Sequence, residues 1–201
     1  MTDVKPSTQI VPHNRTLNGI RTRKRDSLMF LRSLATAACC TLLVTASFAQ
    51  QPPASPPATA NVTLNGKDVT IKYNSPRLKG RTIGSDIVPY GQVWRTGANP
   101  ATTLVTATNL KIGTLDVPAG TYTIYTLPSA EKWMLIVNKQ TGQWGTEYNQ
   151  PQDLGRTPMT NKAAPSSQEN MSISFENTKG SATELHVKWG TTDEYVAVKA
   201  Q

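Results

Sequence analysis

The sequence predicts an all-β protein, an antiparallel β-sandwich of about eight to ten short strands. Three observations support this fold class. Apolar and polar residues alternate along many short runs, clusters of turn-forming residues separate these runs at close spacing, and no segment shows a sustained helical period. The weak helical pattern at residues 162–170 contains Pro165, which would break a helix.

A β-hairpin is predicted at the start of the folded domain. Its two strands flank Asn65-Gly66, a pair that accepts the positive φ angles of a tight hairpin turn. The alternation places five apolar residues on one face, namely Val62, Leu64, Val69, Ile71 and Tyr73. We expect a second hairpin at residues 114–127, where Pro118 and Gly120 separate two runs rich in strand-forming residues.

The C-terminal part shows the clearest alternation. Residues 171–176, 184–189 and 194–200 each alternate apolar and polar side chains, and turn-forming clusters lie between them. These three runs predict a meander of three strands. Two further strands are expected at residues 102–108 and 132–138, and the second is apolar on both faces, as a central strand would be.

Residues 1–49 have the pattern of a secretory signal peptide. A basic cluster is followed by an apolar stretch and then by small residues. Ser47 and Ala49 occupy the two positions that signal peptidase reads, so cleavage would leave Gln50 as the first mature residue. Met29 opens a shorter signal of the same pattern and is the alternative start of translation.

Two other interpretations of this leader are weaker. Cys39 or Cys40 could carry a lipid, but neither has a Leu three positions before it, and the apolar run continues beyond both. The apolar core, residues 34–49, is shorter than the ~18 to 20 residues that a membrane-spanning helix needs. We therefore expect a secreted or periplasmic protein with no stable membrane span after cleavage.

The positive charge of the chain lies mostly in this leader. The full chain has 21 Lys and Arg against 13 Asp and Glu, and residues 1–49 hold 7 and 2 of these. The mature chain, with 14 against 11, has no basic stripe or module that would bind nucleic acid. Residues 50–60 are rich in Pro and Ala and are expected to form a linker, so the sandwich domain would span residues 61–201.

The mature sequence carries no strong catalytic signature. Both cysteines lie in the leader, and no phosphate-binding loop, nucleophile elbow or zinc-protease motif is present. His186, the only mature histidine, falls on the polar face of its strand and is expected to be exposed, which argues against a histidine-based triad or metal site. We therefore expect no metal and no cofactor.

Carboxylates remain available for acid–base chemistry. Asp116 is expected to face water on a hairpin, and Asp193 and Glu194 are expected in a solvated turn. Asp86 is available as well, and sequence spacing does not pair any of these carboxylates. Glu147 and Asp153 lie in the second long segment without strand pattern, so they are the ones to test for a hydrolase.

Two long segments, residues 74–100 and 142–170, lack strand patterning, and long loops in compact domains are usually functional or disordered. Arg grips a carboxylate or phosphate through a rigid fork of donors, and Trp and Tyr stack on sugars, rings or guanidinium groups. We expect a pocket where the two segments meet. The candidate ligand-binding residues are Arg77, Arg81, Tyr90, Trp94, Arg95, Asn99, Trp144 and Glu147.

A purely structural role for the same residues stays open. Trp94 would then close one end of the sandwich, Arg95 would pair with a carboxylate, and Asn99 would close the following turn. Trp133 and Trp189, which lie on predicted strands, are assigned to the core or its margin.

Five blocks of the sequence follow one another in a recognisable order: SPRLKGRTI, VPYGQVWRTGANPAT, VPAGTYTIYTLP, WMLIVNK and GQWG. In this order and spacing they resemble a family of exported bacterial proteins known as domain of unknown function 2911, and YGQVWRTGAN is the most specific block. The resemblance runs from about Val69 to the C-terminus. It implies export and a single β-rich domain. It implies no catalytic residue, because the family has no established activity.

Three functions are compatible with these features. The favoured one is a non-catalytic protein of the cell envelope that binds a small anionic or sugar-like ligand or an envelope protein. The alternative is a hydrolase that acts through carboxylates and Arg, and the third is a purely structural envelope protein. A pocket lined by Trp with Arg95 at its mouth would favour binding, whereas two facing carboxylates would favour hydrolysis.

Overall fold

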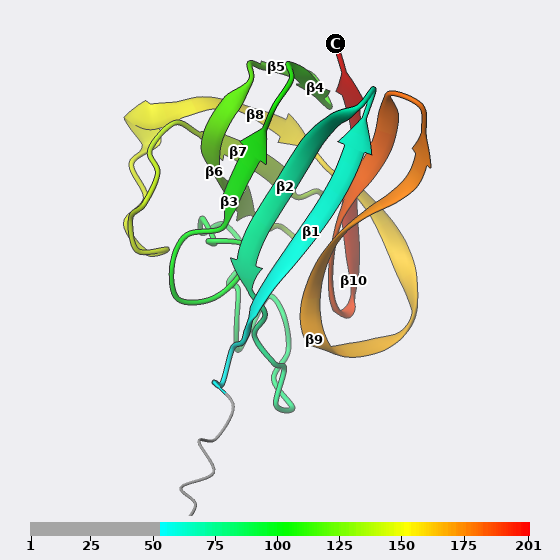
Figure 1. The fold of residues 1–201 in the computed structure, drawn as a ribbon. Coiled ribbons are helices and arrows are strands. Elements are labelled where there is room, and N and C mark those ends of the chain that lie inside the picture. The colour runs from blue at the N-terminus through cyan, green and yellow to red at the C-terminus, as the bar shows by residue number, and fades with distance from the viewer. Residues whose placement is uncertain (1–52) are drawn as a thin grey trace, which may run out of the picture. The chain divides into compact units, whose positions relative to one another are not determined.

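A computed structural model of the protein describes residues 53–201, so the predicted signal peptide and the start of the predicted linker lie outside the described residues. Within this part the chain forms ten strands and one short 3₁₀ turn, Gln150–Gln152. The strands form two antiparallel sheets, which confirms the predicted all-β sandwich (Figure 1). None of the described residues belongs to a helix long and apolar enough to cross a membrane.

The larger sheet has six strands in the order β1-β2-β3-β6-β7-β8, and the smaller has four in the order β5-β4-β10-β9. The strands of the larger sheet are β1 (Pro57–Leu64), β2 (Lys67–Asn74), β3 (Thr103–Thr106), β6 (Gly120–Leu127), β7 (Met134–Asn138) and β8 (Asp153–Pro158). Those of the smaller sheet are β4 (Leu110–Ile112), β5 (Leu115–Val117), β9 (Thr160–Lys179) and β10 (Ala182–Ala200).

The core forms where the apolar residues of the alternating strands meet. Fully buried side chains come from the larger sheet, such as Leu64, Ile71 and Leu135, and from the smaller sheet, such as Leu185 and Val198. Burying a side chain of this size contributes ~1.5–3 kcal/mol. β7 lies between β6 and β8 with its successive residues buried, so the predicted central strand is confirmed.

β1 and β2 form the first predicted hairpin. Asn65 and Gly66 connect the two strands with φ angles of 50° and 74°. β1 begins at Pro57, earlier than the expected domain start at Asn61, because the pairing with β2 continues as far as Asn74. Part of the Pro-rich stretch therefore belongs to the edge of the sheet.

The second predicted hairpin is wrong, although both of its strands exist. β5 pairs with β4 in the smaller sheet, and β6 pairs with β3 and β7 in the larger sheet. The turn from Pro118 to Gly120 therefore carries the chain from one sheet to the other. Turn residues show where a chain bends, but the pairing partner depends on tertiary packing.

The predicted three-strand meander is also wrong, because its last two runs form a single strand. β10 passes through Gly190 without a turn and pairs with β9 from Ala182 to Tyr195. Gly190 has a φ of 58° and lies between two shifts in register, so it forms a bulge. β8 and β9 also occupy much of the segment 142–170, which is expected from the sequence to be loop.

The first long segment does lack strands. β2 ends at Asn74 and β3 begins at Thr103, and only isolated bridges occur between them. Residues 75–102, called the long loop below, gather at one end of the sheets (Figure 1). This loop carries the sequence block that the resemblance identifies as most specific.

Candidate ligand-binding site

A pocket of about 450 Å³ lies between the long loop and β10. Two Trp rings, two Arg side chains and one carboxylate contribute to its lining. The residues that matter most are Arg81, Asp86, Trp94, Arg95, Asn99 and Trp189. We call this concavity the Trp94 pocket.

Trp94 is held in the pocket wall by backbone and ring contacts. Its N–H donates to the Thr126 carbonyl at 2.7 Å, and its carbonyl accepts from the Thr126 N–H at 2.9 Å. Its ring stacks on Trp189 with 5.8 Å between centroids and meets Trp133 edge-on at 6.2 Å. Trp133 and Trp189 are buried, as predicted, whereas Trp94 is partly exposed and can contact a ligand.

Arg95 packs against Gly145 of the second predicted segment. A side chain at Gly145 would collide with Arg95 Cδ and with the Asn99 carbonyl, so this close approach requires glycine. Arg95 Nε is buried and has no hydrogen-bonding partner among the described residues. A buried donor without a partner is destabilising by about 1–3 kcal/mol, and an anion that accepted its hydrogen bond would remove this cost.

The backbone of the long loop is strained next to these side chains. Val88 and Thr96, both β-branched, have φ angles of 53° and 51°, and Asn99 has one of 60°. Such strain persists only where the surrounding structure enforces it. Thr96 is fully buried, its hydroxyl donates to the Thr126 hydroxyl at 3.2 Å, and its carbonyl accepts from Thr102 at 2.9 Å. The loop is therefore fixed in one conformation around Arg95.

Arg81 and Asp86 complete the polar lining of the Trp94 pocket. Arg81 donates through Nε to the Leu78 carbonyl at 2.9 Å and through Nη2 to the Arg77 carbonyl at 2.8 Å. Asp86 Oδ2 accepts from the Thr82 N–H at 2.8 Å. Both side chains are thus positioned by the backbone of the loop itself.

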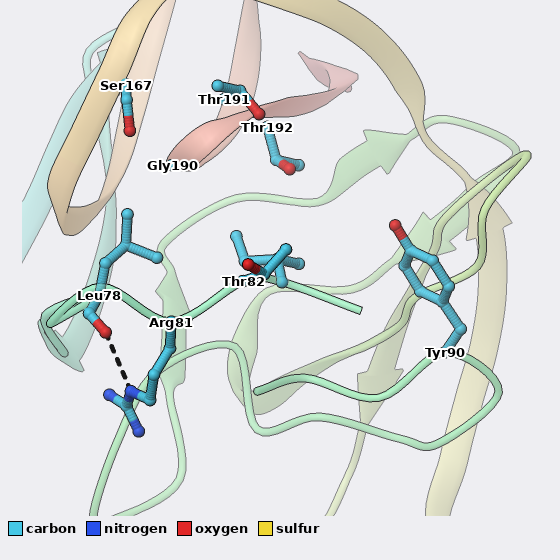
Figure 2. A pocket seen from close by; sticks show the side chains of 9 residues that line it. Leu78, Arg81, Thr82, Tyr90, Ser167, Gly190, Thr191 and Thr192 are labelled. Atoms are coloured by element: carbon cyan, nitrogen blue, oxygen red, sulfur yellow. Dashed lines mark hydrogen bonds between the residues drawn. The ribbon is translucent and has the colours of Figure 1, made fainter. Parts of the chain in front are cut away.

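The remaining predicted site residues lie outside this pocket. Arg77 is exposed, and Tyr90, 48% exposed, lines a separate pocket (Figure 2). The two predicted segments do meet, because Pro100 and Trp144 form a β-bridge. However, Trp144 is 50% exposed, and neither it nor Glu147 contributes to the Trp94 pocket.

The expectation that His186 is exposed is wrong, because its side chain is fully buried. Its Nδ1 lies 2.7 Å from Asp193 Oδ1, and its Nε2 lies 3.2 Å from Glu184 Oε2. Its ring stacks on Tyr195 with 5.0 Å between centroids. In a straight strand, the seven-residue spacing would place His186 and Asp193 about 23 Å apart. β10 must therefore bend at the Gly190 bulge, and the bend brings polar side chains from its two halves together and buries them.

The expected solvated turn at Asp193 and Glu194 is wrong for the same reason, since each residue is 3% exposed. Lys188 Nζ lies 3.8 Å from Asp193 Oδ2 and adds a positive charge beside this cluster. Glu194 Oε1 accepts from Asn161 Nδ2 at 2.8 Å, while its Oε2 is buried without a partner in residues 53–201. Burial raises the pKa of Glu194 above its usual value.

The two carboxylates singled out for hydrolysis do not line the Trp94 pocket. Glu147 is exposed, whereas Asp153 accepts hydrogen bonds from the Tyr148 hydroxyl at 2.6 Å and from Arg156 Nη2 at 3.0 Å. Burial and the hydrogen bond to Asp153 raise the pKa of Tyr148 to about 12. Asp116 is exposed, as expected, and pairs with Lys111 at 3.0 Å.

Across residues 53–201, no group of three or more His, Cys, Asp or Glu residues is arranged to hold a metal ion. The residues that sequence reasoning missed are those of the buried cluster around His186. The one signal for it is Gly190 followed by four polar residues inside an otherwise alternating run, a pattern that a bulge explains as well as a turn does.

Comparison with known proteins agrees with the sequence blocks described above. A family described as protein of unknown function (DUF2911) matches residues 55–198. No curated protein and no solved structure matches the chain. The family match covers both sheets and the long loop with its Trp94 pocket. The chain therefore belongs to the DUF2911 family of proteins of unknown function.

Proposed function

We propose that this protein is exported to the cell envelope and binds a small anionic ligand in the Trp94 pocket without catalysing a reaction. The observation that carries the proposal is Arg95, which lines that pocket and has a buried Nε without a hydrogen-bonding partner among the described residues. An Arg fork presents several donors to one carboxylate or phosphate group. Within residues 53–201, none of the salt bridges includes Arg95.

The other lining residues support an anion with an organic part. Arg81 adds a second positive charge, and Asp86 is the only carboxylate among the lining residues. Trp94 is partly exposed and lines the pocket together with Trp189, on which its ring stacks, so these rings offer apolar contact to a bound molecule. A ring or chain attached to the anionic group would stack there.

Binding is supported better than hydrolysis through paired carboxylates. Such a hydrolase needs two carboxylates across the bound substrate. In the Trp94 pocket, Asp86 lacks a second carboxylate among the lining residues, and its Oδ2 already accepts from the Thr82 N–H. The strained loop around Thr96 and Asn99 also suits a rigid binding site, because pre-organisation lowers the entropy cost of capture.

Export rests on the sequence of the leader and is tested by the mass of the mature protein. Protein purified from the periplasm or medium of cells that express the full chain should begin at Gln50. Retention of Met1 or Met29, or a lipid on Cys39 or Cys40, would contradict this arm of the proposal.

Binding is tested by thermal-shift measurements with inorganic phosphate, a phosphate monoester, citrate and glucuronate. At least one of these anions should stabilise the wild type, by ~2.7 kcal/mol at a hundredfold excess over its Kd. Arg95→Ala should fold and lose that gain. Arg77→Ala removes an exposed Arg of the same loop that does not line the pocket, so it should keep the gain.

The structural alternative makes a different prediction for the same variants. Arg95→Ala would destabilise the domain as severely as Trp94→Ala, and no anion would raise the melting temperature of the wild type. The long loop would then have a purely structural role. If anions stabilise the Arg95→Ala and wild-type proteins equally, the anion site lies elsewhere and the proposal is overturned.

A further inference from the structure

A second pocket, of about 270 Å³, lies between the long loop and the bulge of β10 (Figure 2). We propose that it binds an uncharged polyhydroxy ligand, of which a sugar ring is the matching chemical class. This site shares Arg81 with the anion site proposed above, but its other polar lining differs, and the proposal does not depend on the anion site. We call it the hydroxyl pocket, after the five residues whose hydroxyl groups line it: Thr82, Tyr90, Ser167, Thr191 and Thr192.

The hydroxyl groups of these five residues are all free to bind a ligand. None of these five hydroxyl groups has a hydrogen-bonding partner in the described part of the chain; Thr82, for example, forms hydrogen bonds only through its backbone N–H and carbonyl. In contrast, the Ser75 and Thr102 hydroxyls of the long loop donate to backbone carbonyls at 2.6 and 2.9 Å. Each free hydroxyl can donate and accept, which is the property that recognition of a sugar hydroxyl requires.

The bulge at Gly190 places two successive threonines in the same pocket. In a regular strand, neighbouring side chains point to opposite faces, so Thr191 and Thr192 could not both line one site. The shifts in register on either side of Gly190 change this alternation. A Cβ at Gly190 would contact Leu78 and Ile83 at 3.6 and 3.7 Å, so the bulge also rests directly on the long loop.

Tyr90 is oriented by close packing on Gly84. A Cβ atom at Gly84 would lie 2.5 Å from Tyr90 Cζ, and Gly84 has a φ of 93°, so only glycine fits under the ring. Figure 2 shows the hydroxyl end of Tyr90 turned toward the side of the pocket formed by Thr82 and Thr192. The ring is thus fixed while its hydroxyl stays available, and this arrangement lowers the entropy cost of binding.

The one charged side chain of the pocket is directed away from its threonines. Arg81 is the only charged residue among its lining residues. Its Nε and Nη2 already donate to the Leu78 and Arg77 carbonyls, and Figure 2 shows the guanidinium directed away from the threonines. Leu78 and Ile83 supply apolar contact for the C–H faces of a ring, whereas the Trp94 pocket combines Arg95 with aromatic rings.

The proposal is tested by amide NMR of protein purified from cells that express the full chain. The probes are the methyl glycosides of glucose, mannose and galactose, together with N-acetylglucosamine. At least one should produce saturable shifts that centre on Thr82, Ser167, Thr191 and Thr192. If none does so up to its solubility limit, the proposal is overturned.

Variants then locate the site. Tyr90→Phe keeps the ring on Gly84 and removes one hydroxyl, and the double variant Thr191→Val/Thr192→Val removes two while it keeps the side-chain shape. Each should weaken binding of the active sugar about tenfold. Thr121→Val makes the same chemical change at an exposed residue that does not line the pocket, so it should leave the affinity unchanged.

Two further outcomes separate this site from the anion site. Arg95→Ala should retain sugar binding, because Arg95 does not line the hydroxyl pocket. If only glucuronate binds, and Arg95→Ala abolishes that binding, the hydroxyl pocket is not a sugar site. If the valine and phenylalanine variants bind the neutral sugar as the wild type does, the sugar binds elsewhere and the proposal is likewise overturned.

Discussion

The indole ring of Trp94 lies nearly parallel to that of Trp189, with 5.8 Å between centroids and 15° between planes. This stack joins the long loop to β10 and forms one wall of the Trp94 pocket. Trp189 Nε1 also donates to the Glu169 carbonyl of β9 at 3.1 Å, so the inner ring of the stack is fixed to the smaller sheet. The candidate site and the core therefore share one aromatic contact.

Truncation of the two stacked rings should have unequal effects. Trp189 is 4% exposed, so Trp189→Ala should lower the free energy of unfolding by ~3–5 kcal/mol. Trp94→Ala should cost less, because part of that ring is already in contact with water. Urea denaturation measures both. Trp144→Ala is the matched control, because Trp144 is 50% exposed and should contribute little; an effect as large as that of Trp189→Ala would contradict the assigned core.

His186→Ala should destabilise the domain strongly. The variant leaves Asp193, 3% exposed, without the imidazole 2.7 Å from its carboxylate. Leaving a buried polar group without its hydrogen-bonding partner costs about 1–3 kcal/mol, and more where the group is charged. Lys111→Ala breaks an exposed pair with Asp116 and should leave the urea midpoint unchanged. Equal midpoints for the His186 and Lys111 variants would show that the buried cluster contributes nothing to stability.

Glu194→Gln should be more stable than the wild type at neutral pH. Burial raises the pKa of Glu194 above 4.5, so the folded state holds this proton more tightly than the unfolded state. Protonated Glu194 therefore contributes stability, which is fully present below the pKa that Glu194 has in the unfolded state. This contribution is lost as the pH rises through the pKa that Glu194 has in the folded state. The advantage of the variant should therefore disappear in acid, as urea denaturation at about pH 4 and pH 7 would reveal.

Glu184→Gln is a control for which the change in stability at neutral pH should have the opposite sign. Hydrogen bonds from Asn177 and His186 lower the pKa of Glu184 in the folded state. Ionised Glu184 therefore contributes stability above the pKa that it has in the unfolded state, and this stability is lost as the pH falls through its folded-state pKa. This variant should be less stable than the wild type at neutral pH, and the gap should close in acid. The same sign for both variants would contradict the assigned environments.

Gly84→Ala should destabilise the protein more than Gly142→Ala does. Both glycines have positive φ, 93° and 81°, so each alanine carries backbone strain of about 1–3 kcal/mol. The alanine methyl at position 84 also collides with the Tyr90 ring, whereas a Cβ at Gly142 meets nothing within 4 Å. Thermal denaturation compares the two variants, and equal melting temperatures would mean that Tyr90 is not packed on Gly84.

The sequence by itself determined the local elements. Alternation specified the strands, because a residue period of two matches the two faces of a sheet. Asn65-Gly66 specified a hairpin, because that pair accepts the φ angles of 50° and 74° found there. The lack of alternation in the long loop identified the segment that carries Trp94 and Arg95, and four of the eight candidate site residues, Arg81, Trp94, Arg95 and Asn99, do share one pocket.

Only the tertiary structure decided which strands pair and which polar faces are covered. Pro118 and Gly120 mark a bend, but the contacts of β5 and β6 with other strands place them in different sheets. Gly190 could have formed a turn; it forms a bulge because β9 pairs with β10 on both sides of it. Alternation puts His186 on the polar face of β10, but whether that face meets water depends on how the strand bends through space, and a pattern of single residues does not encode that bend.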